Sequence, residues 1–372
     1  MQSGKKLCMI YNIAPRYREA IFQAIDAEYD CDWYFGDIKT DIKQMDLSLL
    51  KSVSFYHVIG NPARFCWKTK LLRLLFDKQY HTYFMLFNTH SVADWLFVLL
   101  ANIFLRKKKI YIWGHGWYGH ESRLEATMKL WLFRHVTGIF LYGHYARNLL
   151  IERGIPAEKL FVIHNSLHYD QQLELRKNLH YTKIYKDHFG NINPILLFIG
   201  RLTKVKQLDM LIEAVAGLRK KGEVYNLVFV GDGSERRTLE QLVYERHLED
   251  YVWFYGESYD EKINAELIYN ADLCVAPGNV GLTAMHTMVF GTPVISHDSF
   301  KWQMPEFEAI QKNETGDFFE YMNIESLMNT ISRWFANKNG KRDDVRLACY
   351  KEIDTQWNPY YQMEQIQTHL KF

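Results

Sequence analysis

Short apolar segments alternate with helical periods along the whole chain, and this alternation constrains the fold more than any other feature. Segments typical of strands occur in two series. The first comprises Leu7–Tyr11, Phe55–Ile59, Tyr83–Phe87, Lys109–Trp113, Gly138–Leu141 and Leu160–Ile163, and the second comprises Ile195–Ile199, Leu227–Val230, Val252–Tyr255, Leu273–Ala276 and Pro293–Ser296. Strands that alternate with helices predict parallel sheets covered by helices on both faces. The two series therefore predict an α/β protein with two doubly wound domains.

The chain length agrees with two domains, because 372 residues exceed the roughly 250–300 at which one hydrophobic core stops growing. We expect the boundary in the polar stretch 168–193, which has no strong period and is typical of a linker. This linker would join an N-terminal domain over residues 1–167 to a C-terminal domain over residues 194–353. A break around Trp357 precedes a last apolar helical face, so residues 354–372 are predicted to pack back on the N-terminal domain.

Composition excludes several protein classes. Hydrophobic residues make up 48% and charged residues 24%, which excludes a disordered or fibrous chain. The best apolar run, Ala93–Leu105, contains Asp94 and is shorter than the roughly 20 residues of a membrane-spanning helix. Asn12 and Arg16 interrupt the N-terminal apolar stretch too early for a signal peptide. The five cysteines are scattered and form no CxxC pair, so we expect a cytoplasmic protein.

Positive charge is concentrated in the first half of the sequence. Residues 1–185 carry 25 Lys and Arg against 16 Asp and Glu, although the whole chain has a net charge of only +2. Two basic amphipathic stretches, Phe65–Phe76 and Arg106–Lys109, are predicted to contact an anionic membrane surface. The alternatives are core helices with a solvated basic edge, or attraction between the two halves of the chain. Nucleic-acid binding is not expected, because no reader motif occurs.

A series of short motifs between Ile195 and Ile295 carries a family resemblance. The motifs are Phe198–Leu202 followed by Lys206, Val230–Gly233, Val252–Gly256, Tyr269–Leu273, Ala276–Pro277 and Phe290–Ile295. In this order and spacing they resemble the nucleotide-sugar domain of family 4 glycosyltransferases of the GT-B fold. The resemblance implies two Rossmann-like domains that face each other across a cleft, and a nucleotide diphosphate sugar, UDP- or GDP-linked, as co-substrate without a further cofactor. The N-terminal half matches in architecture only.

Two cations follow the first strand of this region. A departing diphosphate needs fixed positive charge, and Arg201 and Lys206 come just after Gly200 at a strand end. In the family the matching Arg and Lys bind the diphosphate, whereas without the resemblance the pair could be a solvated helix start. The helix that begins at Gly281, Leu282 and Thr283 and is expected to run to Phe290 offers free amides to phosphate oxygens, or is an ordinary buried helix.

Other positions of the C-terminal half are assigned by the resemblance. Asp232, Tyr255 and Gly256 are expected near the base and ribose of the donor. The family carries two glutamates seven residues apart, and the matching positions here are Gly278 and His286. Asn279 could replace the first glutamate in part. His286 could still bond a ribose hydroxyl, or could be a buried helix histidine.

The N-terminal half is expected to hold the acceptor. Asn12, Pro15, Arg16 and Tyr17 directly follow the first strand, where similar enzymes line their cleft. Trp113, His115 and Trp117 follow another strand in a Gly-rich loop. Tryptophans can stack on sugar faces, and His115 suits proton transfer at neutral pH. The alternative for this loop is a structural histidine between glycines.

No metal site is predicted. Asp30 and Asp32 resemble the carboxylate pair of the other main glycosyltransferase fold, but no strand pattern of that fold accompanies them. The 15 histidines show no metal-ligand spacing. Charge on the leaving group is therefore expected to be met by side chains and a helix N-terminus.

Together these features predict a glycosyltransferase. It would move a hexose, with retention, from the nucleotide sugar to a glycan acceptor that is polyprenyl-linked, in surface polysaccharide synthesis. The protein is expected to work in the cytoplasm, peripherally at the inner face of the cell membrane. A nucleotide-sugar epimerase and a catalytically silent sugar-nucleotide-binding protein remain alternatives, the latter because of Gly278 and His286.

Overall fold

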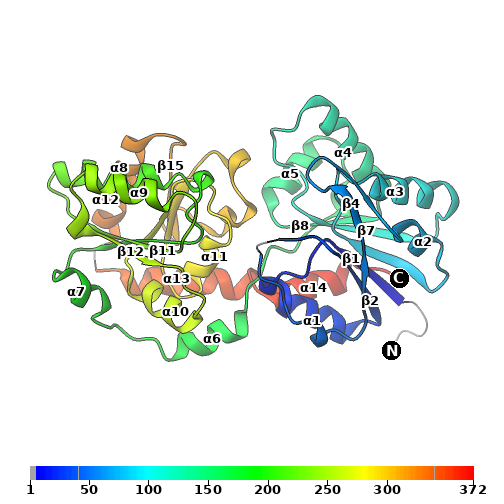
Figure 1. Cartoon of the computed structure of the whole chain (residues 1–372), viewed down its shortest axis with the longest axis horizontal. Coiled ribbons are helices and arrows are strands. Elements are labelled where there is room, and N and C mark those ends of the chain that lie inside the picture. Colours follow the sequence, from blue (N-terminus) through cyan, green and yellow to red (C-terminus); the bar gives the residue numbers. More distant parts are fainter. Residues whose placement is uncertain (1–5, 41, 339) are drawn as a thin grey trace. The chain divides into compact units, whose positions relative to one another are not determined.

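The computed structural model describes residues 6–40, 42–338 and 340–372. The chain divides into two compact units, each with its own parallel sheet (Figure 1). The first unit comprises Met1–His168 together with Asn358–Phe372, and the second comprises Tyr169–Trp357. The predicted doubly wound α/β class is confirmed. No helix among the described residues is both long enough and apolar enough to cross a lipid bilayer.

The first unit is built on a seven-stranded parallel sheet with the order β3-β2-β1-β6-β7-β8-β9. Its strands are β1 (Lys6–Tyr11), β2 (Cys31–Gly36), β3 (Val53–Tyr56), β6 (Tyr80–Met85), β7 (Lys109–Gly114), β8 (Gly138–Leu141) and β9 (Leu160–Val162). A separate antiparallel pair is formed by β4 (Val58–Asn61) and β5 (Phe65–Lys68). The strand order reverses between β1 and β6, and open α/β sheets bind ligands at the carboxyl ends of strands beside such a reversal.

Helices cover both faces of this sheet (Figure 1). They are α1 (Glu19–Glu28), α2 (Leu71–Phe76), α3 (Val92–Phe104), α4 (Arg123–His135), α5 (His144–Glu152) and α14 (Pro359–His369). One core cluster joins α2, α3, α4 and α5 to the sheet, and another joins α1 and α14 to its other face. The apolar side chains of β1 alternate between the two clusters, because successive side chains of a strand point to opposite faces.

The second unit has a six-stranded parallel sheet with the order β12-β11-β10-β13-β14-β15. Its strands are β10 (Ile195–Ile199), β11 (Asn226–Val230), β12 (Val252–Gly256), β13 (Leu273–Ala276), β14 (Val294–His297) and β15 (Gly316–Phe319). Its helices are α6 (Tyr169–Lys177), α7 (Ile184–Phe189), α8 (Leu208–Lys220), α9 (Arg236–Glu245), α10 (Glu261–Asn270), α11 (Thr283–Met288), α12 (Ile324–Lys338) and α13 (Arg342–Gln356). Here the order reverses between β10 and β13, which again marks the carboxyl ends of the strands as a ligand position.

The predicted linker over 168–193 needs correction, because it contains α6 and α7 of the second unit. Polar contacts attach them to the rest of the second unit. The Tyr169 hydroxyl donates to Asp354 at 2.8 Å, the Tyr185 hydroxyl donates to the carbonyl of Leu267 at 2.6 Å, and Arg176 also donates to Asp354 at 2.7 Å. Attachment through scattered polar side chains gives the sequence no regular apolar period. The C-terminal segment also begins later than predicted, since residues 354–356 complete α13 and the first unit resumes at Asn358.

Strands β2 and β15 were not predicted, because each carries an acidic residue that interrupts its apolar pattern. Both carboxylates are paired: Asp32 lies 2.7 Å from Lys6, and Asp317 lies 2.9 Å from Arg333. The predicted helix from Gly281 is shorter than expected and ends at Met288.

The basic stretch Phe65–Phe76 has one face in the core and an exposed edge that carries Lys70 and Arg73. It forms β5 and then α2, and its leucines enter the core. Lys68 is buried and donates to Asp94 at 2.7 Å, and the Asp94 carboxylate also accepts from Ser91 at 2.8 Å. Lys68, paired inside the core, is not available to a membrane, whereas Lys70 and Arg73 are exposed, so membrane contact of this stretch stays a prediction.

Candidate functional site

In the second unit, the loops after β10, β11 and β12 meet where these strands end. The Gly200 amide donates to the carbonyl of Val230 at 2.9 Å, which joins the ends of β10 and β11. The Gly231 amide donates to the carbonyl of Gly256 at 2.7 Å and joins β11 to β12. Neighbouring strands of a parallel sheet end at the same edge, so motifs far apart in the sequence form one surface.

Glycines permit this close approach. Gly200 has a φ of 145°, a conformation that L side chains rarely adopt. At Gly231, a Cβ atom would lie 2.0 Å from the carbonyl oxygen of Gly200. The glycines after β10 and β11 therefore let two backbones lie side by side, with their edge open to a ligand.

Lys206 lies at the centre of this edge. Its Nζ atom donates to the backbone and side-chain oxygens of Asn279, at 2.7 and 2.9 Å. Burial lowers the pKa of Lys206 to about 8; the carboxylate of Glu306 acts against this shift and the charge of Arg201 acts with it. The Arg201 side chain is exposed, and among the residues that the structure describes none forms a hydrogen bond or ion pair with its guanidinium. The two predicted cations thus influence each other at the end of β10.

Gly278, at the position of the first family glutamate, has no room for a side chain. A Cβ atom there would lie 2.1 Å from the carbonyl oxygen of Val205 and 2.7 Å from the Cα atom of Lys206. The Gly278 amide donates to the carbonyl of Lys206 at 2.9 Å. Asn279, considered as a partial replacement for the glutamate, instead holds the Lys206 amine.

His286 faces a carboxylate from another helix. Its Nε2 atom lies 3.0 and 3.2 Å from the two carboxylate oxygens of Glu261, at the start of α10. Burial would raise the pKa of Glu261, but His286 and a 2.8 Å hydrogen bond from Gln172 outweigh burial and bring the pKa to about 2. Sequence reasoning missed Glu261, because no motif spacing links it to His286.

The remaining predicted donor residues lie along the same edge. The Thr283 hydroxyl donates to the carbonyl of Ile199 at 2.9 Å, and Gly281 lies near the amine of Lys206. Leu282 is half-buried just before α11. Asp232 is exposed and accepts from the Gly233 amide at 2.6 Å. Tyr255 packs edge-on against Trp253 on β12, with Gly256 after it.

In the first unit, the predicted acceptor loop follows β1 directly. Asn12 accepts from the Ile13 amide at 2.9 Å, and Pro15 forms a bridge with Gln44. Arg16 is exposed and Tyr17 is half-buried, so both can meet a ligand at this edge.

The expected stacking of Trp113 and Trp117 on sugars is wrong for this structure. Their exposed fractions are 0% and 2%, and they belong to the two core clusters on opposite faces of the sheet. His115 lies between them, and burial, with the charges of Arg18 and Lys129, lowers its pKa to about 4. At neutral pH the imidazole is therefore uncharged, and its Nδ1 atom has no hydrogen-bond partner among the described residues.

Arg18 is a residue that the motif analysis passed over. Its exposed fraction is 7%, and its Cζ atom lies 4.8 Å from the centre of the Trp113 ring. One terminal nitrogen donates to the Tyr142 hydroxyl, and the other, Nη1, has no partner among the described residues. A buried cation with an unused donor, beside the strand ends of β1 and β7, favours an anionic ligand.

Metal ligands do not gather among the described residues, where no group of three or more His, Cys, Asp or Glu side chains could hold an ion. Asp32 is engaged by Lys6 at 2.7 Å and by the Tyr80 hydroxyl at 2.5 Å. Asp30, in the loop before β2, is exposed.

Comparisons with known proteins agree with these motifs. Residues 185–351 match the family model of glycosyl transferases group 1. Alpha-D-kanosaminyltransferase of Streptomyces kanamyceticus is 33% identical over 108 residues, 28% of each chain. The amylovoran biosynthesis glycosyltransferase AmsK of Erwinia amylovora is 26% identical over 229 residues, 58% of this chain and 52% of AmsK. The chain thus spans about half, or less, of the length of these curated relatives.

Solved structures resemble nearly the whole chain. Anabaena HepE in complex with UDP superposes with a TM-score of 0.71 at 16% identity, covering 98% of this chain and 99% of HepE. The lipopolysaccharide outer core galactosyltransferase WaaB superposes with a TM-score of 0.69 at 17% identity, covering 98% and 100%. The family match over residues 185–351 and the curated relatives support a glycosyltransferase of the family 4-like type, and the superposed structures show that the chain has the GT-B fold.

Proposed function

We propose that this protein transfers a hexose from a nucleotide diphosphate sugar to a glycan acceptor. The observation that carries the proposal is the pair of cations after β10, Arg201 and Lys206, within the region that matches the family. HepE, which has the same fold, binds UDP. A uridine or guanosine diphosphate sugar is the corresponding donor here, and no metal or further cofactor enters the proposal.

The chemistry follows from the charge that develops on the leaving diphosphate. The guanidinium of Arg201 and the amine of Lys206, which Asn279 holds in place, oppose that charge, and this lowers the barrier to breaking the sugar–phosphate bond. The Lys206 amine rests on neutral oxygens of Asn279, so an arriving phosphate oxygen can replace them at little electrostatic cost. The pair of His286 and Glu261 offers hydrogen-bond partners for ribose hydroxyls.

The acceptor side of the proposal rests on the first unit. His115 was expected to suit proton transfer at neutral pH, but a pKa of about 4 makes its imidazole a weak base, so the proposal assigns it contact with the acceptor and no proton transfer. Arg18 supplies a buried positive charge for an anionic group of the acceptor. AmsK and WaaB belong to polysaccharide and lipopolysaccharide synthesis, which supports a lipid-linked glycan acceptor at the cytoplasmic membrane face. Retention of the anomeric configuration is part of the same proposal.

The test is a panel of nucleotide sugars scored by three readouts. Thermal shift reports donor binding, since a ligand that binds only the folded state raises the melting temperature. Product analysis then separates sugar transfer from an isomerised donor. Donor binding without either product would leave a silent binding protein, and an isomerised donor would identify an epimerase. Transfer that survives unchanged in Arg201→Ala and Lys206→Ala would refute the assigned site.

A further inference from the structure

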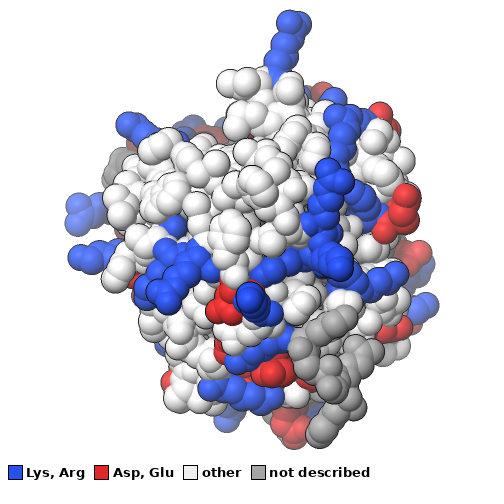
Figure 2. Space-filling view, turned by 90° about the vertical axis from the view of Figure 1, so that its right-hand side faces the viewer, with Lys and Arg blue, Asp and Glu red and all other residues white. Residues whose placement is uncertain are grey.

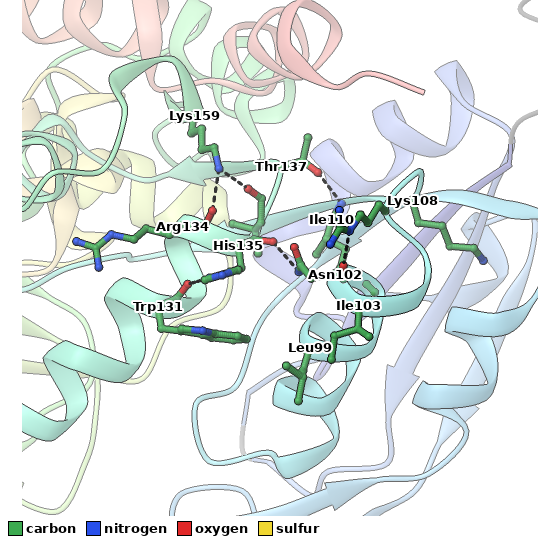
Figure 3. A pocket seen from close by; sticks show the side chains of 13 residues that line it. Leu99, Asn102, Ile103, Lys108, Ile110, Trp131, Arg134, His135, Thr137 and Lys159 are labelled. Atoms are coloured by element: carbon green, nitrogen blue, oxygen red, sulfur yellow. Dashed lines mark hydrogen bonds between the residues drawn. The ribbon is translucent and has the colours of Figure 1, made fainter.

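A cavity of about 690 Å³ opens at the other edge of the first unit's sheet, where β7, β8 and β9 begin (Figure 3). Its walls are the second half of α3, the turn into β7, the last turn of α4 and the residue before β9. The side chains used below are Leu99, Ile103, Arg106, Arg134 and Lys159. The proposed acceptor loops follow the carboxyl ends of β1 and β7. Because β7 has six residues, the two edges lie about 17 Å apart.

All charged side chains that line the cavity are basic. They are Arg106, Lys108, Arg134 and Lys159, with His135 beside them. Two of the cations are fixed by backbone oxygens: Lys159 donates to the carbonyls of Arg134 and Val136 at 2.9 and 3.1 Å, and Lys108 donates to the carbonyl of Leu75 at 2.6 Å. Within the described ranges, none of the four forms an ion pair. The Lys108 amine is held by the carbonyls of Leu75 and Asp77 and points away from Arg134 and Lys159 in Figure 3, so the unneutralised positive charge of the cavity comes from Arg106, Arg134 and Lys159.

Arg106 and Arg134 are exposed and weakly held. The Arg106 Nε atom lies 3.3 Å from the carbonyl oxygen of Asn102, and one terminal nitrogen of Arg134 lies 3.5 Å from the carbonyl oxygen of Arg153. Both guanidinium groups keep donors that an anion can use. A planar guanidinium binds phosphate oxygens in a fixed two-pronged geometry, which a phosphate group in the cavity would exploit.

Apolar side chains stand exposed beside these cations. Leu99, Ile103 and Phe104 on α3 have exposed fractions of 38%, 53% and 66%. The opposite side of the same helix packs Phe97 and Ala101 into the core, so α3 is apolar on more than one face. Figure 2 shows the corresponding end of the first unit, where lysine and arginine side chains border a broad area without charged residues. Apolar surface bordered by cations suits an amphiphile with a negative head.

We propose that this cavity binds the phosphate headgroup of an anionic phospholipid, while Ile103 and Phe104 enter the interfacial layer of the bilayer. The proposal rests on the membrane contact of the proposed function but not on the transfer reaction. Free phosphate would use the cations alone, whereas a lipid also covers the apolar side chains of α3. Because the cavity and the acceptor loops lie at opposite sheet edges, the lipid here is an anchor and not the acceptor.

The experiment measures flotation of the purified chain with vesicles of phosphatidylcholine alone and of phosphatidylcholine mixed with phosphatidylglycerol. The variant Arg106→Gln/Arg134→Gln removes the two loosely held cations. Two cations near an anionic surface account for about a thirtyfold change in partition coefficient, so this loss is expected for the mixed vesicles. The matched control, Arg64→Gln/Arg123→Gln, removes two exposed charges of the same unit that do not line the cavity, and should lose only a few-fold.

A second variant and a phosphate control distinguish lipid binding from general charge attraction and from binding of free phosphate. Ile103→Ser/Phe104→Ser should weaken binding to the mixed vesicles while leaving the melting temperature near that of the wild type, since both side chains are exposed. Equal losses in the two arginine variants would overturn the proposal in favour of general charge attraction. A wild-type chain that stays unbound to mixed vesicles would also overturn it. So would inorganic phosphate that raises the melting temperature through the same arginines without any vesicle binding.

Discussion

The pKa of Lys206 gives a sharp test of the donor site. Burial lowers that pKa from the ordinary 10.5 to about 8 in the ligand-free protein. The charged amine therefore costs folding free energy of about 3 kcal/mol at pH below 8, and the cost fades as the pH rises toward the ordinary pKa. A diphosphate beside the amine restores the charged form. Donor binding should then be accompanied by proton uptake around pH 8.

The expected change in UDP affinity follows from the Lys206 pKa of about 8. At pH 9, one unit above the pKa, only about a tenth of the ligand-free protein carries the charged amine, so affinity for UDP should fall about tenfold between pH 7 and pH 9. Titration calorimetry in two buffers of different ionisation enthalpy measures both the affinity and the protons taken up. The control is Lys206→Arg, because a guanidinium does not titrate in this range. If wild type and Lys206→Arg lose affinity in parallel, the reasoning is refuted.

Three further predictions concern the donor site and the core. Arg201→Ala should reduce turnover about a hundredfold with little change in melting temperature, because the side chain is exposed; steady-state kinetics and a thermal scan check this together. Transfer should persist in excess EDTA, and a loss that manganese or magnesium restores would contradict the metal-independent proposal. Asp94→Asn leaves the buried amine of Lys68 without its carboxylate, so we expect a loss of about 3–5 kcal/mol, read from chemical denaturation; an unchanged midpoint would show that the pair contributes nothing.

The sequence predicts the fold well where strands are uniformly apolar and buried on both faces. Strands β8, β10 and β13 have the bounds that their apolar runs indicate. It fails where a tertiary partner compensates a local exception, as Lys6 does for Asp32 in β2. Such partners lie outside any local window, so periodicity cannot reveal them.

The residues of the candidate site likewise fall into those that motif order predicts and those that depend on tertiary contacts. Motif order places Arg201 and Lys206 after β10, and the structure brings their charges near each other. The stacking role of Trp113 and Trp117 was wrong because both side chains enter core clusters, on opposite faces of the sheet. Glu261 and Arg18 depend on contacts between elements that no spacing encodes.

The close packing around Gly278 also limits which substitutions this position can accept. A substitution that brought back a carboxylate there would push its Cβ atom against the Val205 carbonyl, 2.1 Å away. The segment that presents Lys206 would have to shift in the same step, and a shift of that segment moves the amine that meets the diphosphate. A glutamate at position 278 is therefore compatible with this donor site only if the segment that carries Lys206 moves.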